Sequence, residues 1–253
     1  MVTPAAAQAV SPAPAQGRVR RGLRRAVLGV LPLQAWMQLR FELHMLGVRM
    51  RSVGVARRYR HRRDLLVNLG AGTEGRAGWV NVDAFRFPGI NCLLDVRRGL
   101  PFADGSVRGI FCEHFLEHVD YEQEAARLLR ECHRALRPGG VLRLIVPDAE
   151  KYLRGYCSEG WDELARVRPL RPGSTDAYYG HRYTTKMELV NFVFRQVCDH
   201  KYAYDAETLL NLLRRCGFAQ VQQQQFGRSW MPEICLDQAM RATESLYVEA
   251  VKE

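Results

Sequence analysis

The sequence predicts an α/β fold whose mostly parallel, doubly wound sheet is preceded by a helical arm. From residue 64 onward, short apolar segments that end in glycine or an acid alternate with turns and helical patterns, which is typical of such a sheet. In residues 22–51, apolar side chains recur at helical spacing opposite Arg and Gln, which predicts an amphipathic helix. The length of 253 residues and the hydrophobic content of 47% are enough for one sizeable core.

The composition divides the chain into a tail, an arm and a domain. Residues 1–17 are rich in Ala, Pro and Gln and carry no charged side chain, so we expect a disordered tail. Residues 18–63 hold thirteen Arg, no Lys and one acid, which gives a net charge of +12. This arm is expected to form one amphipathic helix, or two that meet at Pro32, followed by a basic linker. Residues 64–253 have a net charge of −2 and are expected to form the domain.

The charge of the arm has three interpretations. The arm can pack on the domain as a solvated helix, lie on an anionic membrane surface, or bind nucleic acid, which is the least favoured of the three. No uninterrupted apolar run reaches the ~18–20 residues that span a bilayer. The seven cysteines form no Cys-x-x-Cys pair, which suits a reducing compartment. We therefore expect a cytoplasmic protein, attached at most to the inner face of a membrane.

Within the domain, seven segments are expected to be strands: 65–69, 79–82, 91–95, 109–112, 141–146, 218–226 and 246–251. One helix is expected over 121–136, and a second over 205–216, with Asp205 as its N-cap and Gly217 as its stop. Residues 149–205 are less regular and rich in Tyr, Arg and Gly. We expect them to be an insertion or a cap.

Three predicted strand tips carry residues that suit a nucleoside-type ligand. Asn68 precedes Gly70-Ala71-Gly72, where the missing Cβ atoms would let a ligand approach the backbone, although an ordinary glycine-rich turn explains this segment equally well. Asp83, at the second tip, can accept both ribose hydroxyls or cap a turn. At the third tip, Asp95 can accept from an adenine amino group while the backbone at Val96 meets a ring nitrogen. Three such tips in this order are far more specific than any one of them.

Five segments together resemble the class I methyltransferases that depend on S-adenosylmethionine (SAM), and most closely their small bacterial type 11 branch. The segments are Asn68–Gly72, Gly78–Asp83, Leu100–Ser106, Leu116–His118 and Leu136–Gly140. The resemblance covers about residues 64–253. It implies a Rossmann-like sheet of seven strands, SAM as the methyl donor, and the strand tips as its binding residues.

Two departures from the usual pattern concern the first strand tip. Thr73 and Glu74 stand where a third glycine is usual, and Asp83 follows Gly72 by only eleven residues. Dinucleotide folds place the corresponding acid about 20 residues on. The first crossover therefore has no room for a full helix and must be a loop or a single turn.

The resemblance also indicates where the chemistry takes place. In a class I fold the fourth strand ends beside the transferred methyl group, so Glu113 and His114 are the best-placed polar groups. Glu113 is expected to shape the cofactor pocket, and His114 to take a proton from a sugar or phenol hydroxyl. Asp148, after the fifth strand, and His200, in the insertion, are expected to face the same cleft as further catalytic candidates. The alternatives are that Glu113 only shapes the cofactor pocket, that His118 caps a helix, and that His200 belongs to a polar loop.

Residues 114–118 also match the inverted zinc-protease motif His-x-x-Glu-His. A zinc hydrolase with His114 and His118 as ligands and Glu117 as base is thus a remote alternative. That motif needs a further acidic ligand on a downstream helix and has no use for acids at upstream strand tips. We therefore expect no metal.

The resemblance predicts O-methylation of a sugar or glycan precursor, because the type 11 branch often serves surface polysaccharide pathways. A lipid-linked substrate at the inner face of a membrane would suit the basic arm. A methyltransferase for another small metabolite or for RNA, and a SAM-binding protein without turnover, are the alternatives.

Overall fold

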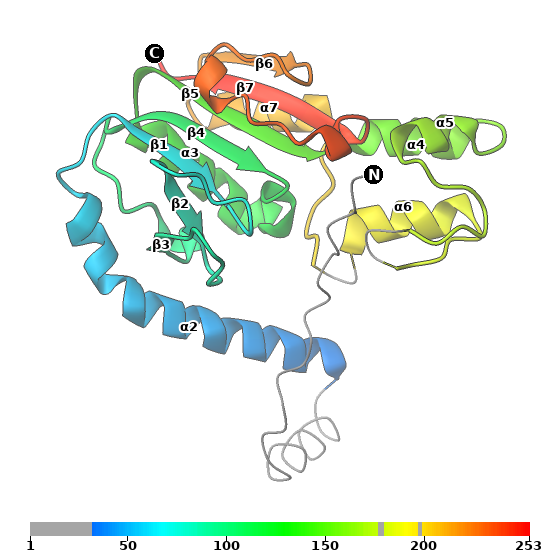
Figure 1. The fold of residues 1–253 in the computed structure, drawn as a ribbon, viewed down its shortest axis with the longest axis horizontal. Coiled ribbons are helices and arrows are strands. Elements are labelled where there is room, and N and C mark those ends of the chain that lie inside the picture. Colours follow the sequence, from blue (N-terminus) through cyan, green and yellow to red (C-terminus); the bar gives the residue numbers. More distant parts are fainter. Residues whose placement is uncertain (1–31, 177–179, 197–198) are drawn as a thin grey trace, which may run out of the picture.

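The computed structural model describes residues 32–176, 180–196 and 199–253. Its seven-stranded sheet has the order β3-β2-β1-β4-β5-β7-β6, in which all neighbours are parallel except β7, which is antiparallel to both β5 and β6 (Figure 1). The predicted Rossmann-like fold with a mostly parallel sheet is thus confirmed. The predicted tail and the first part of the arm, through residue 31, lie outside the described residues.

The strands are β1 (Leu65–Leu69), β2 (Val80–Asp83), β3 (Cys92–Leu93), β4 (Val107–Glu113), β5 (Leu136–Pro147), β6 (Gln220–Gln224) and β7 (Ser245–Val251). The helices are α2 (Leu33–Tyr59), α3 (Ala126–Ala135), α4 (Ala149–Cys157), α5 (Asp162–Val167), α6 (Lys186–Arg195) and α7 (Ala206–Arg215). Short helical turns include η2 (Leu116–His118), η3 (Tyr121–Ala125), η5 (Pro232–Ile234) and η6 (Ala239–Arg241).

The predicted elements are present with shifted ends. The helix expected over 121–136 begins with the π-helical turn η3 and stops before Leu136, because that residue already belongs to β5. At the second predicted helix, the Asp205 side chain accepts a hydrogen bond from the Thr208 N–H at 2.9 Å and caps α7 as expected. Residues 70–79 contain turns and no helix, so the first crossover is a loop, as the short spacing requires.

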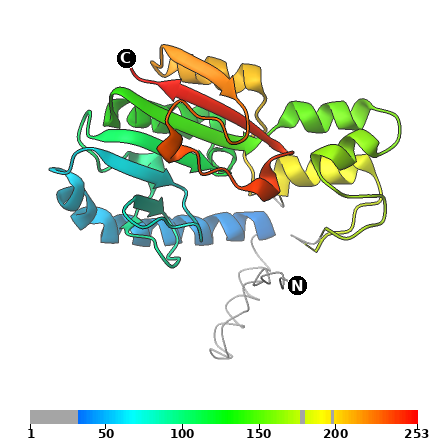
Figure 2. The same ribbon diagram turned by 45° about the horizontal axis from the view of Figure 1, so that its top comes forward.

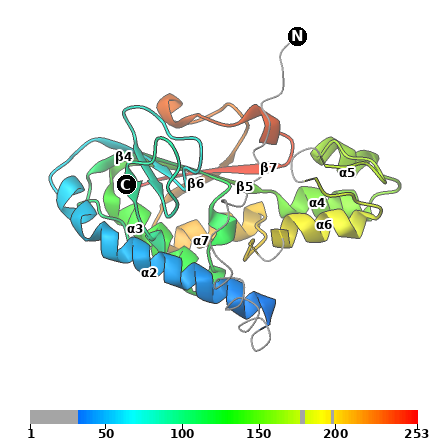
Figure 3. The same cartoon turned by 60° about the horizontal axis from the view of Figure 1, so that its bottom comes forward.

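Among the described residues, the α-helices that pack on the sheet lie on one of its faces. α2, α3 and α7 lie on that face, where their apolar side chains share a core with the strands (Figure 3). The β1–β2 and β2–β3 connections contain no helix and leave the opposite face open. The connection between β6 and β7, residues 225–244, crosses this second face (Figure 2). We call it the covering segment.

A buried arginine ties the covering segment to the sheet. Arg143 on β5 has no exposed surface and donates to both carboxylate oxygens of Asp237, at 2.7 and 2.5 Å. It also donates to Glu249 on β7 at 3.0 Å and to the carbonyl oxygens of Arg228 and Gln225. Two carboxylates and two carbonyl groups accept hydrogen bonds from the guanidinium, so its charge can be buried. Arg143 thereby attaches the covering segment to a face on which no crossover helix of the described chain packs.

Ion pairs hold α2 against the end of β3. Asp95 is 2% exposed, and its carboxylate lies 2.7 Å from Arg49 Nη2 on α2 and 2.9 Å from Arg97 Nε. Arg97 in turn donates to Glu42 on α2 at 2.8 Å. Burial raises the pKa of Asp95, but the hydrogen bonds from Arg97 and Arg49 outweigh burial and lower it. The carboxylate is therefore charged and links the helix to the sheet.

α2 has two apolar faces, whereas the sequence pattern indicates one. Met45, Val48 and Tyr59 are buried against the domain. Four other apolar side chains, which are between 43% and 67% exposed, are Leu39, Leu43, Leu46 and Met50. They follow one another at the spacing of a single helix face, and we call them the α2 stripe. Among the helices that the structure describes, none has the length and hydrophobicity that crossing a membrane requires.

A small lobe stands at the carboxyl edge of the parallel strands. It consists of α4, α5 and α6 and has its own apolar cluster, which includes Tyr152, Leu164 and Leu189 (Figure 1). The chain returns from the lobe along the sheet edge, where the Ala149 N–H donates to the Tyr204 carbonyl at 2.9 Å. The lobe thus closes one side of the edge at which the predicted site residues lie.

The link through Asp95 can be tested by replacing Asp95 with Asn. We expect the free energy of unfolding to fall by about 3 kcal/mol at neutral pH, because two guanidinium groups lose a buried partner. A group with a lowered pKa stabilises the fold above its ordinary value and loses that contribution as pH falls through the lowered pKa. The difference from the wild type should therefore shrink below about pH 4. Urea unfolding measured across this pH range checks both statements.

Asp104→Asn is the matched control for this substitution. Asp104 also pairs with an arginine, Arg134, at 2.6 Å, but its side chain is 81% exposed. Its loss should change the unfolding free energy by less than about 1 kcal/mol. An Asp95→Asn protein no less stable than the Asp104→Asn protein would contradict the role of Asp95.

Candidate active site at the carboxyl edge

The glycine turn and Asp83 lie together, as the sequence predicts. The Gly72 N–H donates to Asp83 Oδ2 at 2.9 Å, and the Phe85 N–H donates to Asp83 Oδ1 at 2.7 Å. Gly72 has a φ of +49°, and a Cβ built there would meet no atom within 4 Å. The backbone at Gly72 is therefore open to a ligand beside the carboxylate of Asp83.

The other residues of the first strand tip hold the turn. The N–H groups of Gly70 and Ala71 both donate to the Val82 carbonyl, at 2.9 and 3.0 Å. Asn68 is buried, and its Nδ2 donates to the Glu74 carbonyl at 2.9 Å. A Cβ on Gly70 would lie 2.3 Å from Phe115 Cγ, so the lack of a side chain there makes room for an aromatic ring.

The third strand tip differs from the expected free acceptor. Both oxygens of the Asp95 carboxylate accept hydrogen bonds from arginines, Oδ2 from Arg49 and Oδ1 from Arg97. The following Val96 is buried and begins a short 3₁₀ turn. An adenine amino group would therefore share Asp95 with two guanidinium groups, and its hydrogen bond to Asp95 stays a prediction.

Glu113 connects the end of β4 to the covering segment. Its Oε1 accepts from the Gln238 N–H at 3.1 Å. Burial raises the pKa of Glu113, and the Gln238 hydrogen bond opposes that shift. The carboxyl group thus links this edge to the covering segment, and its role in the cofactor pocket stays a prediction.

His114 has an unusual backbone conformation. Its φ is +49°, in the left-handed region that residues other than glycine seldom adopt. Its ring Nε2 lies 2.8 Å from Ser245 Oγ, and its Nδ1 lies 3.4 Å from Glu117 Oε1. Such backbone strain persists where the surroundings determine it and is frequent at functional sites.

A cleft of about 180 Å³ opens beside His114. The residues that line it come from the ends of β4 and β5, the lobe and the covering segment, and they include His114, Glu117, His118, Arg168, Phe192, His200, Arg241 and Glu244. Two of the three predicted catalytic residues therefore share one cleft. The third, Asp148, is not among the residues that line it.

Asp148 serves as the N-cap of α4. Its Oδ1 accepts from the backbone N–H groups of Glu150 and Lys151, at 3.1 and 3.4 Å. Burial raises the pKa of its carboxyl group, and the Lys151 charge opposes that shift. These contacts give Asp148 a structural role, and its catalytic role stays a prediction.

His200 approaches the end of β4 because the returning chain pairs with η2. The Lys201 N–H donates to the Glu117 carbonyl at 2.7 Å, which places His200 beside Glu117 and His118. Burial lowers the pKa of His200. For His118, burial acts in the same direction, but the hydrogen bond to Asp199 and the charge of Glu117 outweigh it, so its pKa is raised.

The inverted zinc-protease geometry is not formed. That motif needs His114 and His118 on one face of an α-helix. His114 instead precedes η2, a single 3₁₀ turn of three residues. The zinc hydrolase alternative has the wrong local structure.

Arg168 and Glu244 are cleft residues that the sequence did not single out. Arg168 donates to Asp176 Oδ2 at 2.7 Å and to Glu244 Oε2 at 3.0 Å. The Tyr152 hydroxyl also donates to Glu244, at 2.6 Å. These pairs join the lobe to the covering segment, and no local spacing could have indicated contacts between segments so far apart.

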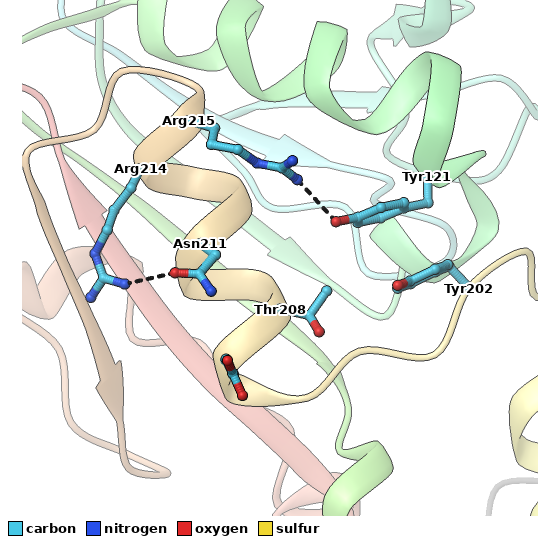
Figure 4. A pocket seen from close by; sticks show the side chains of 7 residues that line it. Tyr121, Tyr202, Thr208, Asn211, Arg214 and Arg215 are labelled. Carbon is cyan, nitrogen blue, oxygen red and sulfur yellow. Dashed lines mark hydrogen bonds between the residues drawn. The ribbon is translucent and has the colours of Figure 1, made fainter.

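A larger surface depression, of about 530 Å³, lies away from the strand tips. Its lining comes from η3, α7 and the residues before α7, where the Arg215 guanidinium donates to the Tyr121 hydroxyl at 3.0 Å (Figure 4). Tyr202 stacks on Tyr121, with ring centroids 4.0 Å apart. None of the predicted site residues lines this depression.

The first two strand tips fit a nucleoside-type cofactor. Gly72 leaves its backbone open, and Asp83 presents a carboxylate at the same point. A ribose could receive its hydrogen bonds there, because strand ends of an open parallel sheet are where such ligands bind. The cleft with His114 begins at the end of β4, the next strand along the sheet.

A family model described as "Methyltransferase domain", of type 11, matches residues 81–144, which run from β2 into β5. No curated protein matches the chain. Among solved structures, an S-adenosylmethionine-dependent methyltransferase from Mesorhizobium loti is 20% identical, with a TM-score of 0.43, over 76% of this chain and 92% of its own. One from Archaeoglobus fulgidus is 17% identical, with a TM-score of 0.44, over 81% and 94%.

The family match and the strand order together indicate the class of protein. The matched residues hold Asp83, the end of β4 and the turn before β5, which are the segments that carry the resemblance. The strand order places them in one sheet, with the strand ends that bear polar groups at one edge. The chain is therefore a methyltransferase that depends on S-adenosylmethionine, and within it residues 81–144 match the type 11 family model.

Proposed function

We propose that the protein methylates a hydroxyl oxygen of a sugar or glycan precursor. The cleft beside His114 is the observation that supports this acceptor class most directly. Its lining combines the Phe192 ring with charged and hydrogen-bonding groups such as Arg168, Glu244 and His200. Such a combination suits a sugar, whose ring stacks on an aromatic face while its hydroxyls meet polar side chains.

The cofactor supplies an electrophilic methyl group when it is bound. The chain would hold it through the backbone at Gly72 and the carboxylate of Asp83, with Glu113 shaping the pocket at the end of β4. The main task of the protein is then to place the acceptor oxygen in line with that methyl group. Arg168 and Glu244 form a fixed pair at the cleft wall and are suited to this positioning.

His114 is the candidate that would take the proton of the acceptor hydroxyl. Its Nε2 is engaged by Ser245, so Nδ1 is the nitrogen left to bind a proton. The Glu117 carboxylate, 3.4 Å from Nδ1, would stabilise the protonated ring. His200 lines the same cleft and remains a second candidate, and Asp148 would act only through its hold on α4.

For the arm, we propose that the α2 stripe lies on an anionic membrane surface, where a lipid-linked acceptor would be found. The stripe is flanked by exposed arginines, among them Arg40 and Arg51. Glu42 is the only acid of residues 18–63, and its carboxylate is already paired with Arg97. An apolar stripe with basic flanks is the composition that binds anionic lipid.

Replacing Asp83 with Ala tests the cofactor site. Losing hydrogen bonds to a charged group should weaken SAM binding about 10- to 100-fold, as measured by isothermal titration calorimetry. Asp104→Ala, which removes an exposed carboxylate, should bind SAM as the wild type does. Unchanged affinity in Asp83→Ala would show that the ribose is held elsewhere.

Replacing His114 with Asn tests the proposed base. Asn tolerates the left-handed backbone conformation and keeps a polar group near Ser245, but it cannot take a proton at neutral pH. We expect kcat to fall about 10²- to 10⁴-fold, with SAM affinity unchanged. The measurement is transfer of labelled methyl from SAM to panels of sugars, small metabolites and RNA, which also separates the competing acceptor classes. Full turnover in the Asn variant would exclude His114 as the base.

Replacing both Leu43 and Leu46 with Glu tests the membrane proposal. Flotation with anionic vesicles should show binding reduced at least about tenfold, because two apolar side chains no longer enter the lipid. Gln222→Glu with Gln223→Glu, on the exposed edge strand β6, introduces the same charge and should bind as the wild type does. If vesicle binding persists while a wild-type dimer dissociates, the α2 stripe is instead a contact between two copies of the chain.

A further inference from the structure

Three side chains with metal-binding donors converge in the cleft. Glu117, His118 and His200 each offer one donor atom, and these atoms all lie within 4.8 Å of one another. Glu117 and His118 belong to η2, whereas His200 comes from the chain that returns from the lobe. The convergence is therefore a product of the tertiary fold and not of local spacing.

The Glu117 carboxylate is buried, and within the described part of the chain its close side-chain partner is the ring of His114. The residue is 1% exposed, both oxygens are inaccessible to solvent, and neither has a hydrogen-bond donor. His114 Nδ1 lies 3.4 Å from Oε1 of Glu117. Because a buried carboxylate is costly unless it is well paired, and His114 approaches only one of its two oxygens, Glu117 has capacity to bind a further cation.

Each histidine of the cluster has one ring nitrogen fixed by another group. His200 Nδ1 donates to the Val193 carbonyl at 2.6 Å, and His118 Nδ1 lies 3.3 Å from the Asp199 carboxylate. These contacts leave Nε2 of both rings for a ligand bond. Histidines that bind metals almost always have their second nitrogen held in this way, by a carbonyl or a carboxylate.

The backbone holds the two segments in register. The Glu117 carbonyl accepts from the N–H groups of Lys201 and Tyr202, at 2.7 and 3.3 Å. The rings of His118 and His200 meet edge to face, with their centroids 4.7 Å apart. The three donors are thus preorganised by two backbone hydrogen bonds and do not depend on a flexible loop tip.

We propose that Glu117, His118 and His200 bind a divalent transition-metal ion of the Zn²⁺ type. Two imidazoles and one carboxylate suit zinc and its first-row neighbours, whereas Mg²⁺ and Ca²⁺ prefer oxygen ligands alone. All three ligands line the cleft, so the remaining coordination positions open toward it, as in catalytic rather than structural zinc sites. The ion could hold the acceptor oxygen, and that role rests on the proposed function. Binding of the ion does not depend on the proposed function.

Cobalt titration of the full chain tests this site without an acceptor. After dialysis against a chelator, the wild type should bind one equivalent of Co²⁺ with a visible absorption band. Glu117→Gln and His200→Ala should each weaken binding by at least about 100-fold, since a direct ligand matters more than its supporting groups. His61→Ala, which removes an exposed histidine away from the cleft, should bind Co²⁺ as the wild type does.

Asp199→Asn provides a milder test of the same geometry. It leaves all three ligands in place and should weaken Co²⁺ binding about 10- to 100-fold through the orientation of His118. SAM affinity, measured on every variant, shows that the fold is retained. If the wild type binds no Co²⁺ at millimolar concentration, or if Glu117→Gln and His200→Ala bind it unchanged, the proposal is overturned and Glu117 only balances the charge of the histidines.

The metal site and the proposed methyl transfer can fail separately. Cobalt binding that depends on the three ligands, together with no methyl transfer to any acceptor panel, would support the site and contradict the proposed function. If the chelator-treated wild type transfers methyl groups but binds no Co²⁺, that result would support the proposed function and contradict the metal site.

Discussion

The buried guanidinium of Arg143 is the interaction on which the rest of the molecule depends. Two crossovers in the first half of the sheet are too short for helices, so one face would be open to water without the covering segment. Arg143 holds that segment through Asp237, and the next residue, Gln238, donates its N–H to Glu113 at the end of β4. Further along, Arg241 and Glu244 line the cleft. The covering segment thus both covers the second face of the sheet and supplies residues of the cleft, so a change at Arg143 would affect both.

Much of the cofactor edge could be predicted from the sequence because its determinants are local. A strand that ends in Gly70-Ala71-Gly72, an acid eleven residues later and the Leu-Arg-Pro-Gly-Gly turn before β5 fix strand order and strand tips within a short stretch of chain. Parallel strands bring their carboxyl ends to the same edge, so Gly72 and Asp83 had to meet there. The missing first helix followed from the same spacing. The N-cap at Asp205 was equally local.

The remainder depends on contacts that no spacing reveals. His200 reaches Glu117 only because the returning chain pairs with η2, so the local zinc motif of residues 114–118 could not indicate a site that includes His200. Asp95 was expected to be a free acceptor, but Arg49 on a distant helix pairs with it. The sequence could not distinguish the two apolar faces of α2, because the rotation of the helix is fixed by ion pairs from Arg49 to Asp95 and from Glu42 to Arg97. In each case a contact between segments far apart in the sequence decides what the local pattern leaves open.

The position of Asp95 has a thermodynamic consequence. The Asp95 carboxylate lies at the end of the strand where the adenine is expected to bind, and it also pairs with Arg49 on α2, the helix of the arm. If the adenine amino group donates a hydrogen bond to the Asp95 carboxylate, it competes with the guanidinium of Arg49 for the same oxygen atoms. The two equilibria would then be reciprocal: whatever loosens the helix alters cofactor affinity, and the cofactor alters the hold on the helix by the same free energy. Binding of the cofactor and attachment of α2 to the domain would then depend on each other, so a change in one could be measured through the other.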